Sequence, residues 1–98
     1  MDFANDPTVA DYRARISAID EEIVDAVSRR ATLVSELHAH KRANHYPLRD
    51  HGREEALLAA LTQRNPGPLS DQRLEELFRL VLAICTTEAA TAAGDAAS

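Results

Sequence analysis

The sequence predicts an all-α protein, and three observations lead to that fold class. Gly and Pro are few, three and four in 98 residues, and neither occurs between Pro7 and Pro47. Aliphatic side chains recur at steps of three and four, which is the period of one helix face. Aromatic residues make up 4% of the chain and Trp is absent, so the core must be aliphatic. The length suits a single domain over residues 1–98.

The first helix is predicted over about residues 7–43. Asp6 provides an N-cap acceptor, and Pro7 suits the first helical position because its missing N–H would have no partner there. At about 1.5 Å per residue this helix would be roughly 55 Å long. Its apolar stripe advances by steps of three and four through Tyr12, Ile16, Ile19, Ile23, Ala26, Leu33 and Leu37.

The length of this helix predicts the assembly. A compact chain of about 100 residues has a radius of gyration of about 13 Å, so the first helix must project beyond any globule that the rest of the chain forms. Its apolar stripe would then stay in water unless a second copy covered it. We therefore expect an entwined homodimeric helical bundle, with three helices in each protomer.

A second helix is predicted over about residues 50–63. Asp50 is placed as its N-cap, and the inner face consists of leucines at helical spacing, Leu57, Leu58 and Leu61. The run Asn65-Pro66-Gly67-Pro68 ends this helix.

A third helix is predicted over about residues 70–89, where Ser70 is the N-cap. Its apolar side runs through Leu74, Phe78, Val81 and Cys85, with Leu77 and Leu82 alongside. Residues 91–98 offer only alanine methyl groups to bury, so we expect a disordered tail there.

Two cations interrupt the apolar stripe of the first helix. Four residues beyond Ala26 the stripe reaches Arg30, and four residues beyond Leu37 it reaches Lys41. A charge on a buried helix face is unfavourable unless an anion meets it. The two positions therefore indicate a pocket for an anion, although the cations could also reach solvent along their apolar stems or pair with Glu54 across the bundle.

Composition limits the other classes of function. A net charge of -5 argues against nucleic acid or an anionic membrane as the main partner, and no apolar run approaches the length of a membrane span. The lone Cys85 cannot form an internal disulfide, and Asp2 and Asp6 stand where a signal peptide would carry positive charge. We therefore expect a cytoplasmic protein.

Metal and nucleophilic sites are not indicated. The histidines, His38, His40, His45 and His51, lack the spacing of a ligand set, and no thiolate or carboxylate completes one. No Ser/His/Asp or Cys/His arrangement and no Gly-rich phosphate loop stands out.

Polar residues at fixed spacing carry a resemblance to a known family. Their order resembles that of the all-helical class of chorismate mutases over about residues 9–90. The motifs are Arg13-x-x-Ile16-x-x-Ile19-Asp20, Arg30, Lys41, Pro47-x-x-Asp50-x-x-Arg53-Glu54, Leu69-Ser70 and Leu77-Phe78-Arg79. The resemblance implies an entwined dimer whose active sites each receive an arginine from the partner's long helix, and by position that arginine is Arg13.

The resemblance also implies a reaction, the concerted [3,3] rearrangement of the dianion chorismate to prephenate, for aromatic amino acid synthesis. Arg13 and Arg30 would hold the two carboxylates, and Lys41 would donate to the ether oxygen as its bond breaks. Arg53 would support the electropositive pocket, and Glu54 with Asp50 would accept from the ring hydroxyl. No cofactor or metal is expected.

The third helix departs from the family pattern at two positions. Cys85 stands where the family commonly has serine, and Ala89 stands where it commonly has a second donor to the ether oxygen. The adjacent Glu88 could serve as that donor only when protonated, and activity would then rise at acidic pH.

Three other functions stay open. The same pocket could rearrange 4-amino-4-deoxychorismate in secondary metabolism, or eliminate pyruvate from isochorismate. A non-catalytic helical dimer that binds a metabolite or regulates an enzyme belongs to a different class, and the six polar residues of the pocket count against it.

Overall fold

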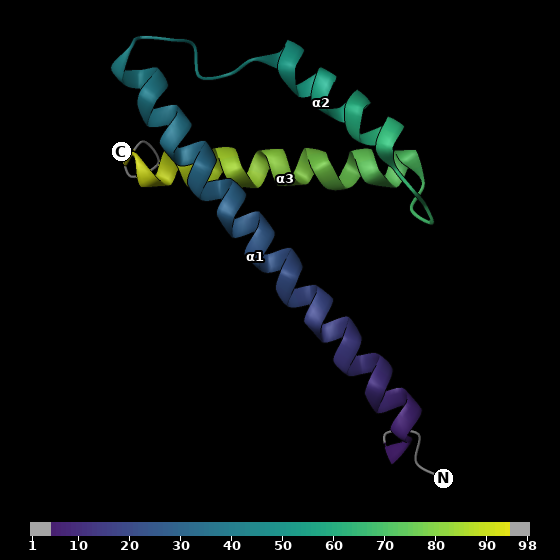
Figure 1. The fold of residues 1–98 in the computed structure, drawn as a ribbon. Coiled ribbons are helices and arrows are strands. Elements are labelled where there is room, and N and C mark those ends of the chain that lie inside the picture. The colour runs from purple at the N-terminus through teal and green to yellow at the C-terminus, as the bar shows by residue number, and fades with distance from the viewer. Residues whose placement is uncertain (1–4, 95–98) are drawn as a thin grey trace.

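The computed structural model describes residues 5–94, which form three α-helices and contain no strand (Figure 1). Helix α1 spans Pro7–Ala43, α2 spans His51–Arg64 and α3 spans Asp71–Ala92. The predicted all-α class, with one very long first helix, is confirmed.

Local signals set both ends of α1. The side chain of Asp6 accepts a hydrogen bond from the backbone N–H of Thr8 at 2.8 Å, and Pro7 is the first helical residue. At the other end, Tyr46 N–H donates to the carbonyl of Lys41 at 2.8 Å, and His45 adopts a positive φ of 57°. This turn sends the chain back from α1 toward α2.

Within residues 5–94, neither α2 nor α3 packs over the first half of α1. Figure 1 shows it projecting away from α2 and α3, and α1 as a whole contains no buried residue. Its apolar side chains, Tyr12, Ile16, Ile19 and Ile23, are each 54–56% exposed. The radius of gyration is 18.1 Å, well above the roughly 13 Å of a compact chain of this length.

The loop between α2 and α3 is held by side chains. Asn65 Nδ2 donates to the carbonyl of Leu69 at 2.6 Å, and the N–H of Gly67 donates to Asn65 Oδ1 at 3.0 Å. Ser70 Oγ then accepts from the N–H of Arg73 at 3.2 Å and begins α3. The loop reverses the direction of the chain, so α3 runs back from the end of α2 and crosses the second half of α1 (Figure 1).

Helix α3 is the centre of the protomer, because it packs against both α1 and α2. The buried side chains within the described range are Leu58, Val81, Cys85 and Ala89. Leu77, predicted to lie alongside the apolar stripe of α3, is 47% exposed in the single chain, because neither α1 nor α2 covers that side of α3.

The end of α3 lies beyond the predicted position. The helix continues to Ala92, so Thr91 and Ala92 are helical rather than part of a tail. The rest of the predicted disordered tail, from residue 95, lies outside the described residues. None of the helices described has a stretch both long and apolar enough to cross a membrane.

Candidate active site

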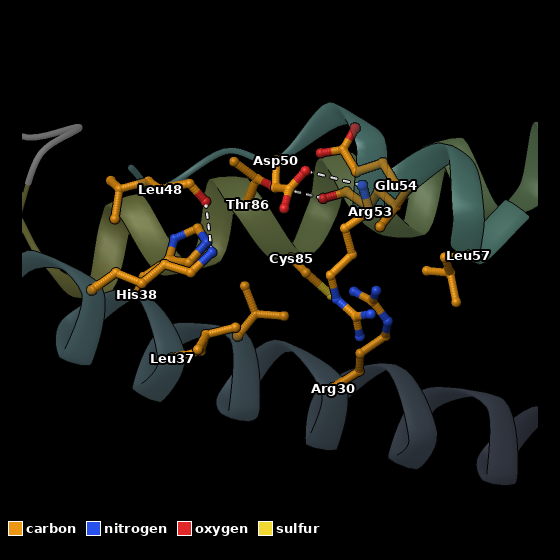
Figure 2. A pocket seen from close by; sticks show the side chains of 13 residues that line it. Arg30, Leu37, His38, Leu48, Asp50, Arg53, Glu54, Leu57, Cys85 and Thr86 are labelled. Atoms are coloured by element: carbon orange, nitrogen blue, oxygen red, sulfur yellow. Dashed lines mark hydrogen bonds between the residues drawn. The ribbon is translucent and has the colours of Figure 1, made fainter. Parts of the chain in front are cut away.

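A cavity lies where the second half of α1 faces α2, α3 and the connection between α1 and α2 (Figure 2). Five of the residues predicted for the site line it together: Arg30, Lys41, Asp50, Arg53 and Glu54. Cys85, also predicted, lines it from α3. The other lining residues are Val34, Leu37, His38, Leu48, Leu57, Leu82 and Thr86.

Two guanidinium groups converge in this cavity. Arg30 extends from α1 and Arg53 from α2, and Figure 2 shows their head groups pointing toward one another. No carboxylate among residues 5–94 pairs with either guanidinium. Like charges that face each other repel, and an anion between them would remove the repulsion. The arrangement therefore has the chemistry to bind a carboxylate or another anion with two acceptor atoms.

Lys41 is the third cation of the cavity. Its Nζ donates to the backbone carbonyl of Leu48 at 3.2 Å, which ties the side chain to the connection after α1. An ammonium group carries three protons, so two remain for a ligand. The half-buried side chain is thereby held in place before any ligand arrives.

Glu54 is paired, but not with the cations of the cavity. Arg49 Nε lies 3.3 Å from Glu54 Oε1, and a second guanidinium nitrogen of Arg49 lies 3.4 Å from Oε2. The alternative that Arg30 or Lys41 pairs with Glu54 is therefore not what the structure shows. Each Glu54 oxygen keeps a further lone pair, so the carboxylate can still accept from a ligand hydroxyl.

Asp50 positions the start of α2. Its Oδ1 accepts a hydrogen bond from the backbone N–H of Arg53 at 3.0 Å, and this is the N-cap bond of the helix. The cap therefore fixes the backbone from which the Arg53 side chain enters the cavity. Because Oδ1 already has this partner, the other carboxylate oxygen is the more available one for a ligand.

Three predicted site residues do not line the cavity. Arg13 lies in the exposed first half of α1. Glu88 is exposed and lines a different hollow with Ser28 and Thr32 of α1. Ala89 is buried where α3 packs on α1, near Ser35 and Ala39.

Neither Glu88 nor Ala89 lines this cavity in the single chain, although the family pattern predicts that one of them faces the ligand. The cavity side of α3 runs through Leu82, Cys85 and Thr86. Residues two apart on a helix point roughly 200° away from each other, so Glu88 points away from the side of Thr86. Ala89 faces α1 one turn further along.

Two polar residues of the cavity, Thr86 and His38, were not predicted as site residues. Thr86 follows Cys85, and its hydroxyl donates to the carbonyl of Leu82 at 2.9 Å. His38 precedes Lys41 by three residues, a spacing that puts both on one side of α1 and could have identified it. In the sequence, the four histidines were considered only as metal ligands, and so His38 was not predicted as a site residue. Within the described range, no group of three or more His, Cys, Asp or Glu side chains could hold a metal ion.

The surroundings of His38 favour its neutral form. Burial and the positive charges of Lys41 and Arg42 lower the pKa of His38 below its ordinary value. The nearby His40 points elsewhere, and its ring packs edge-on against Tyr46 with the centroids 6.2 Å apart.

Comparisons with known proteins agree with this geometry. Two solved structures from Thermus thermophilus are similar, both of chorismate mutase. Form II has a TM-score of 0.79 and 30% identity, and the match covers 82% of this chain and 91% of that one. Form I has a TM-score of 0.78 and 31% identity, with 80% and 98% covered.

A curated relative is the bifunctional chorismate mutase/prephenate dehydratase of Stutzerimonas stutzeri, 32% identical over 79 residues. The match covers 74% of this chain and 21% of that protein, so the chain spans about a fifth of the length of this relative. The profile of the family described as chorismate mutase type II matches residues 12–89. The chain therefore belongs to the type II chorismate mutase family, a family of isomerases.

Proposed function

We propose that this protein catalyses the [3,3] rearrangement of chorismate to prephenate, as an entwined homodimer. The observation that carries the proposal is the convergence of Arg30 and Arg53, without a carboxylate partner among the described residues, beside the tethered Lys41. Chorismate brings two carboxylates and an ether oxygen, and these are the groups that such a cavity can bind.

The reaction needs positioning and electrostatic stabilisation rather than proton transfer. A rate gain of around a millionfold corresponds to about 8 kcal/mol, which these two effects can supply. Arg30 would hold one carboxylate with its planar guanidinium, and Arg53 would add to the positive potential around it. The two free protons of Lys41 would face the ether oxygen, where negative charge develops as the C–O bond breaks.

The ring hydroxyl of the substrate would be bound at the acidic side of the cavity. Glu54 is oriented by Arg49 and keeps acceptor capacity, and Asp50 lies one turn before it. An amine at the same ring position would find the same acceptors. This part of the site therefore supports chorismate and 4-amino-4-deoxychorismate equally.

A second copy would complete the site. The first half of α1 exposes Ile16, Ile19 and Ile23 and carries Arg13 on the same stretch. Covering this apolar surface with the partner's helices would remove it from water. We propose that the partner's Arg13 then reaches the cavity and holds the second carboxylate of the substrate.

The proposed setting is aromatic amino acid synthesis in the cytoplasm. The one cysteine, Cys85, is buried and free, which suits a reducing compartment.

The proposal is tested by following loss of chorismate absorbance with purified protein between about pH 5 and pH 8, with the product identified by chromatography. Sedimentation of the same sample measures the oligomeric state. We expect prephenate to be formed by a dimer. A folded dimer that leaves chorismate unchanged would refute the favoured function, and 4-amino-4-deoxychorismate and isochorismate would then be assayed. Failure with all three would leave a non-catalytic role.

A further inference from the structure

The cavity has two ends with different chemistry. Figure 2 shows the head groups of Arg30 and Arg53 at one end, and the ring of His38 near the backbone of Leu48 at the other. Lys41, which donates to the Leu48 carbonyl, lies three residues after His38 on the same side of α1. A substrate whose carboxylate is held by the guanidinium groups would therefore present another part of its structure to His38 and Lys41.

The end near Leu48 has few protons to offer a ligand. One Lys41 proton is used by the Leu48 carbonyl, and the hydroxyl proton of Thr86 is used by the carbonyl of Leu82. Cys85 is 1% exposed, and a thiol is a weak donor. Within residues 5–94 the imidazole of His38 donates to no protein acceptor. Beside Lys41, His38 is therefore the donor that stays available at this end.

Burial, followed by the charges of Lys41 and Arg42, lowers the pKa of His38 and favours its neutral ring. The charged groups that line hollows with it are Arg30, Lys41 and Arg42 on α1, Arg49 and Asp50 in the connection, and Arg53 and Glu54 on α2. From α3, Cys85, Thr86 and Ala90 line the same hollows, and Cys85 is the one titratable residue among these three. Because burial and the two neighbouring cations of α1 lower the pKa of His38, the ring carries one N–H at neutral pH.

We propose that His38 is a catalytic residue, whose imidazole N–H donates to the ether oxygen of the substrate beside Lys41. This inference rests on the proposed function. In the rearrangement the ether C–O bond breaks, a C–C bond forms within the same molecule, and the oxygen becomes a ketone oxygen. His38 keeps its proton throughout. Its hydrogen bond strengthens as negative charge develops on the oxygen, so it lowers the barrier of the chemical step.

The first test compares three variants, His38→Leu, His38→Gln and His40→Leu. Removing one donor of this kind lowers kcat by about 100-fold, and we expect that loss in His38→Leu with KM within about threefold of the original chain. Gln keeps an N–H donor, so His38→Gln should retain kcat within about fivefold. His40→Leu makes the same change on the same helix outside the cavity, and its kcat should equal that of the original chain.

Two results would overturn the inference: a His38→Leu variant with kcat within threefold of the original chain, or a His38→Gln variant that loses as much as His38→Leu. Circular dichroism and sedimentation establish that each variant is a folded dimer. Failure of the proposed function is a separate result, because the unaltered protein would then not convert chorismate at all.

The pH profile separates His38 from Glu88. An imidazolium donates a stronger, charge-assisted hydrogen bond than a neutral ring, so kcat should rise as the pH falls through the pKa of His38. The rise should disappear in His38→Gln and persist in Glu88→Gln. A rise that persists in His38→Gln and disappears in Glu88→Gln would assign the donor to Glu88 and refute the role of His38.

A binding measurement needs no variant of His38. The unaltered protein is labelled with ¹⁵N at histidine, and imidazole resonances are recorded while prephenate is added; the His40→Leu variant helps to assign the rings. We expect the His38 N–H resonance to move downfield as it gains an acceptor, while that of His40 stays in place. An unchanged His38 resonance in a protein saturated with prephenate would overturn the inference.

Discussion

The two halves of α1 carry the same apolar pattern but lie in different surroundings. From residue 10 to residue 26 every side chain is exposed. Beyond that point the helix packs on α3, and Arg30, Val34, His38 and Lys41 are all half-buried along one side. The apolar pattern is continuous along the helix, but only its second half packs on α3, and even there Leu33 and Leu37 of the stripe stay 65% and 48% exposed.

This difference has a geometric cause. Helix α3 has 22 residues and α1 has 37, so at about 1.5 Å per residue α3 is roughly 20 Å too short to cover α1 even if the two were parallel. The helices also cross rather than align (Figure 1). One half of α1 can therefore build a cavity with α2 and α3, while the other half is the part that we propose a second chain covers.

The largest effect is expected from a substitution that disrupts the proposed dimer interface on the first half of α1. Ile19→Asp places a charge on the exposed apolar stripe, and a charge that must be buried against a partner opposes dimerisation. We expect a monomer in sedimentation, reduced helicity, and a loss of kcat/KM of at least about 1,000-fold, because entwined dimers often have no stable folded monomer.

Ser17→Asp is the matched control, since it adds the same charge roughly 200° away around the helix. A fully active dimer of Ile19→Asp would show that this stripe is not the interface.

In the second half, Arg30→Glu should abolish activity without loss of the fold. The substitution replaces a bidentate donor with a charge that repels a substrate carboxylate, so kcat/KM should fall by at least about 1,000-fold. Arg29→Glu is the control, because Arg29 is exposed and does not line the cavity. Steady-state kinetics on both variants measures the difference. Activity of Arg30→Glu within tenfold of the original chain would exclude Arg30 from substrate binding.

Mixing two inactive variants tests whether the first half of α1 in one chain and the cavity of another chain form one active site. A heterodimer of Arg13→Ala and Lys41→Ala would contain one complete site if Arg13 crosses the interface. Random exchange gives half heterodimers, each with one of two sites intact, so about a quarter of the original activity should return.

The control mixture combines Arg30→Ala with Lys41→Ala. Both residues line the cavity of one protomer, so every site of that heterodimer lacks one of them and no activity should return. A first mixture that stays as inactive as the control would place Arg13 outside the partner's site.

Local signals explain what the sequence could predict. The Asp6-Pro7 start, the Asp50 cap and the Ser70 cap act within four residues, so the helix starts follow from neighbouring residues alone. Arg30 and Lys41 were identified because their own helix places them on its apolar stripe. Their membership of one cavity with Arg53 came from the family pattern and not from spacing.

The position of α3 relative to the cavity could not be predicted in the same way. Which of Cys85, Thr86, Glu88 and Ala89 faces the ligand depends on the rotation of α3 against α1, and that rotation is set by packing between distant residues. Because one helix face includes several neighbouring positions, the sequence does not distinguish which of these residues points toward the ligand. The exposure of Leu77 has the same origin, because the sequence does not indicate which side of α3 the other helices leave uncovered.

The smallest expected effect is a pH dependence of stability that arises in the covered half of α1. The pKa of His38 lies below its ordinary value of 6.5 in the folded chain, through burial and then through Lys41 and Arg42. Between these two values the unfolded chain binds more protons than the folded one, so the free energy of unfolding falls as the pH is lowered through this window and is fully restored above it.

Urea unfolding at pH 5, 6, 7 and 8 measures this effect. The free energy of unfolding should decline less toward low pH in His38→Gln than in the original chain, while His40→Gln should keep the full decline. Equal declines in His38→Gln and the original chain would mean that the imidazole is as well solvated in the fold as in the unfolded chain, and the second half of α1 would then be as open at this position as the first half.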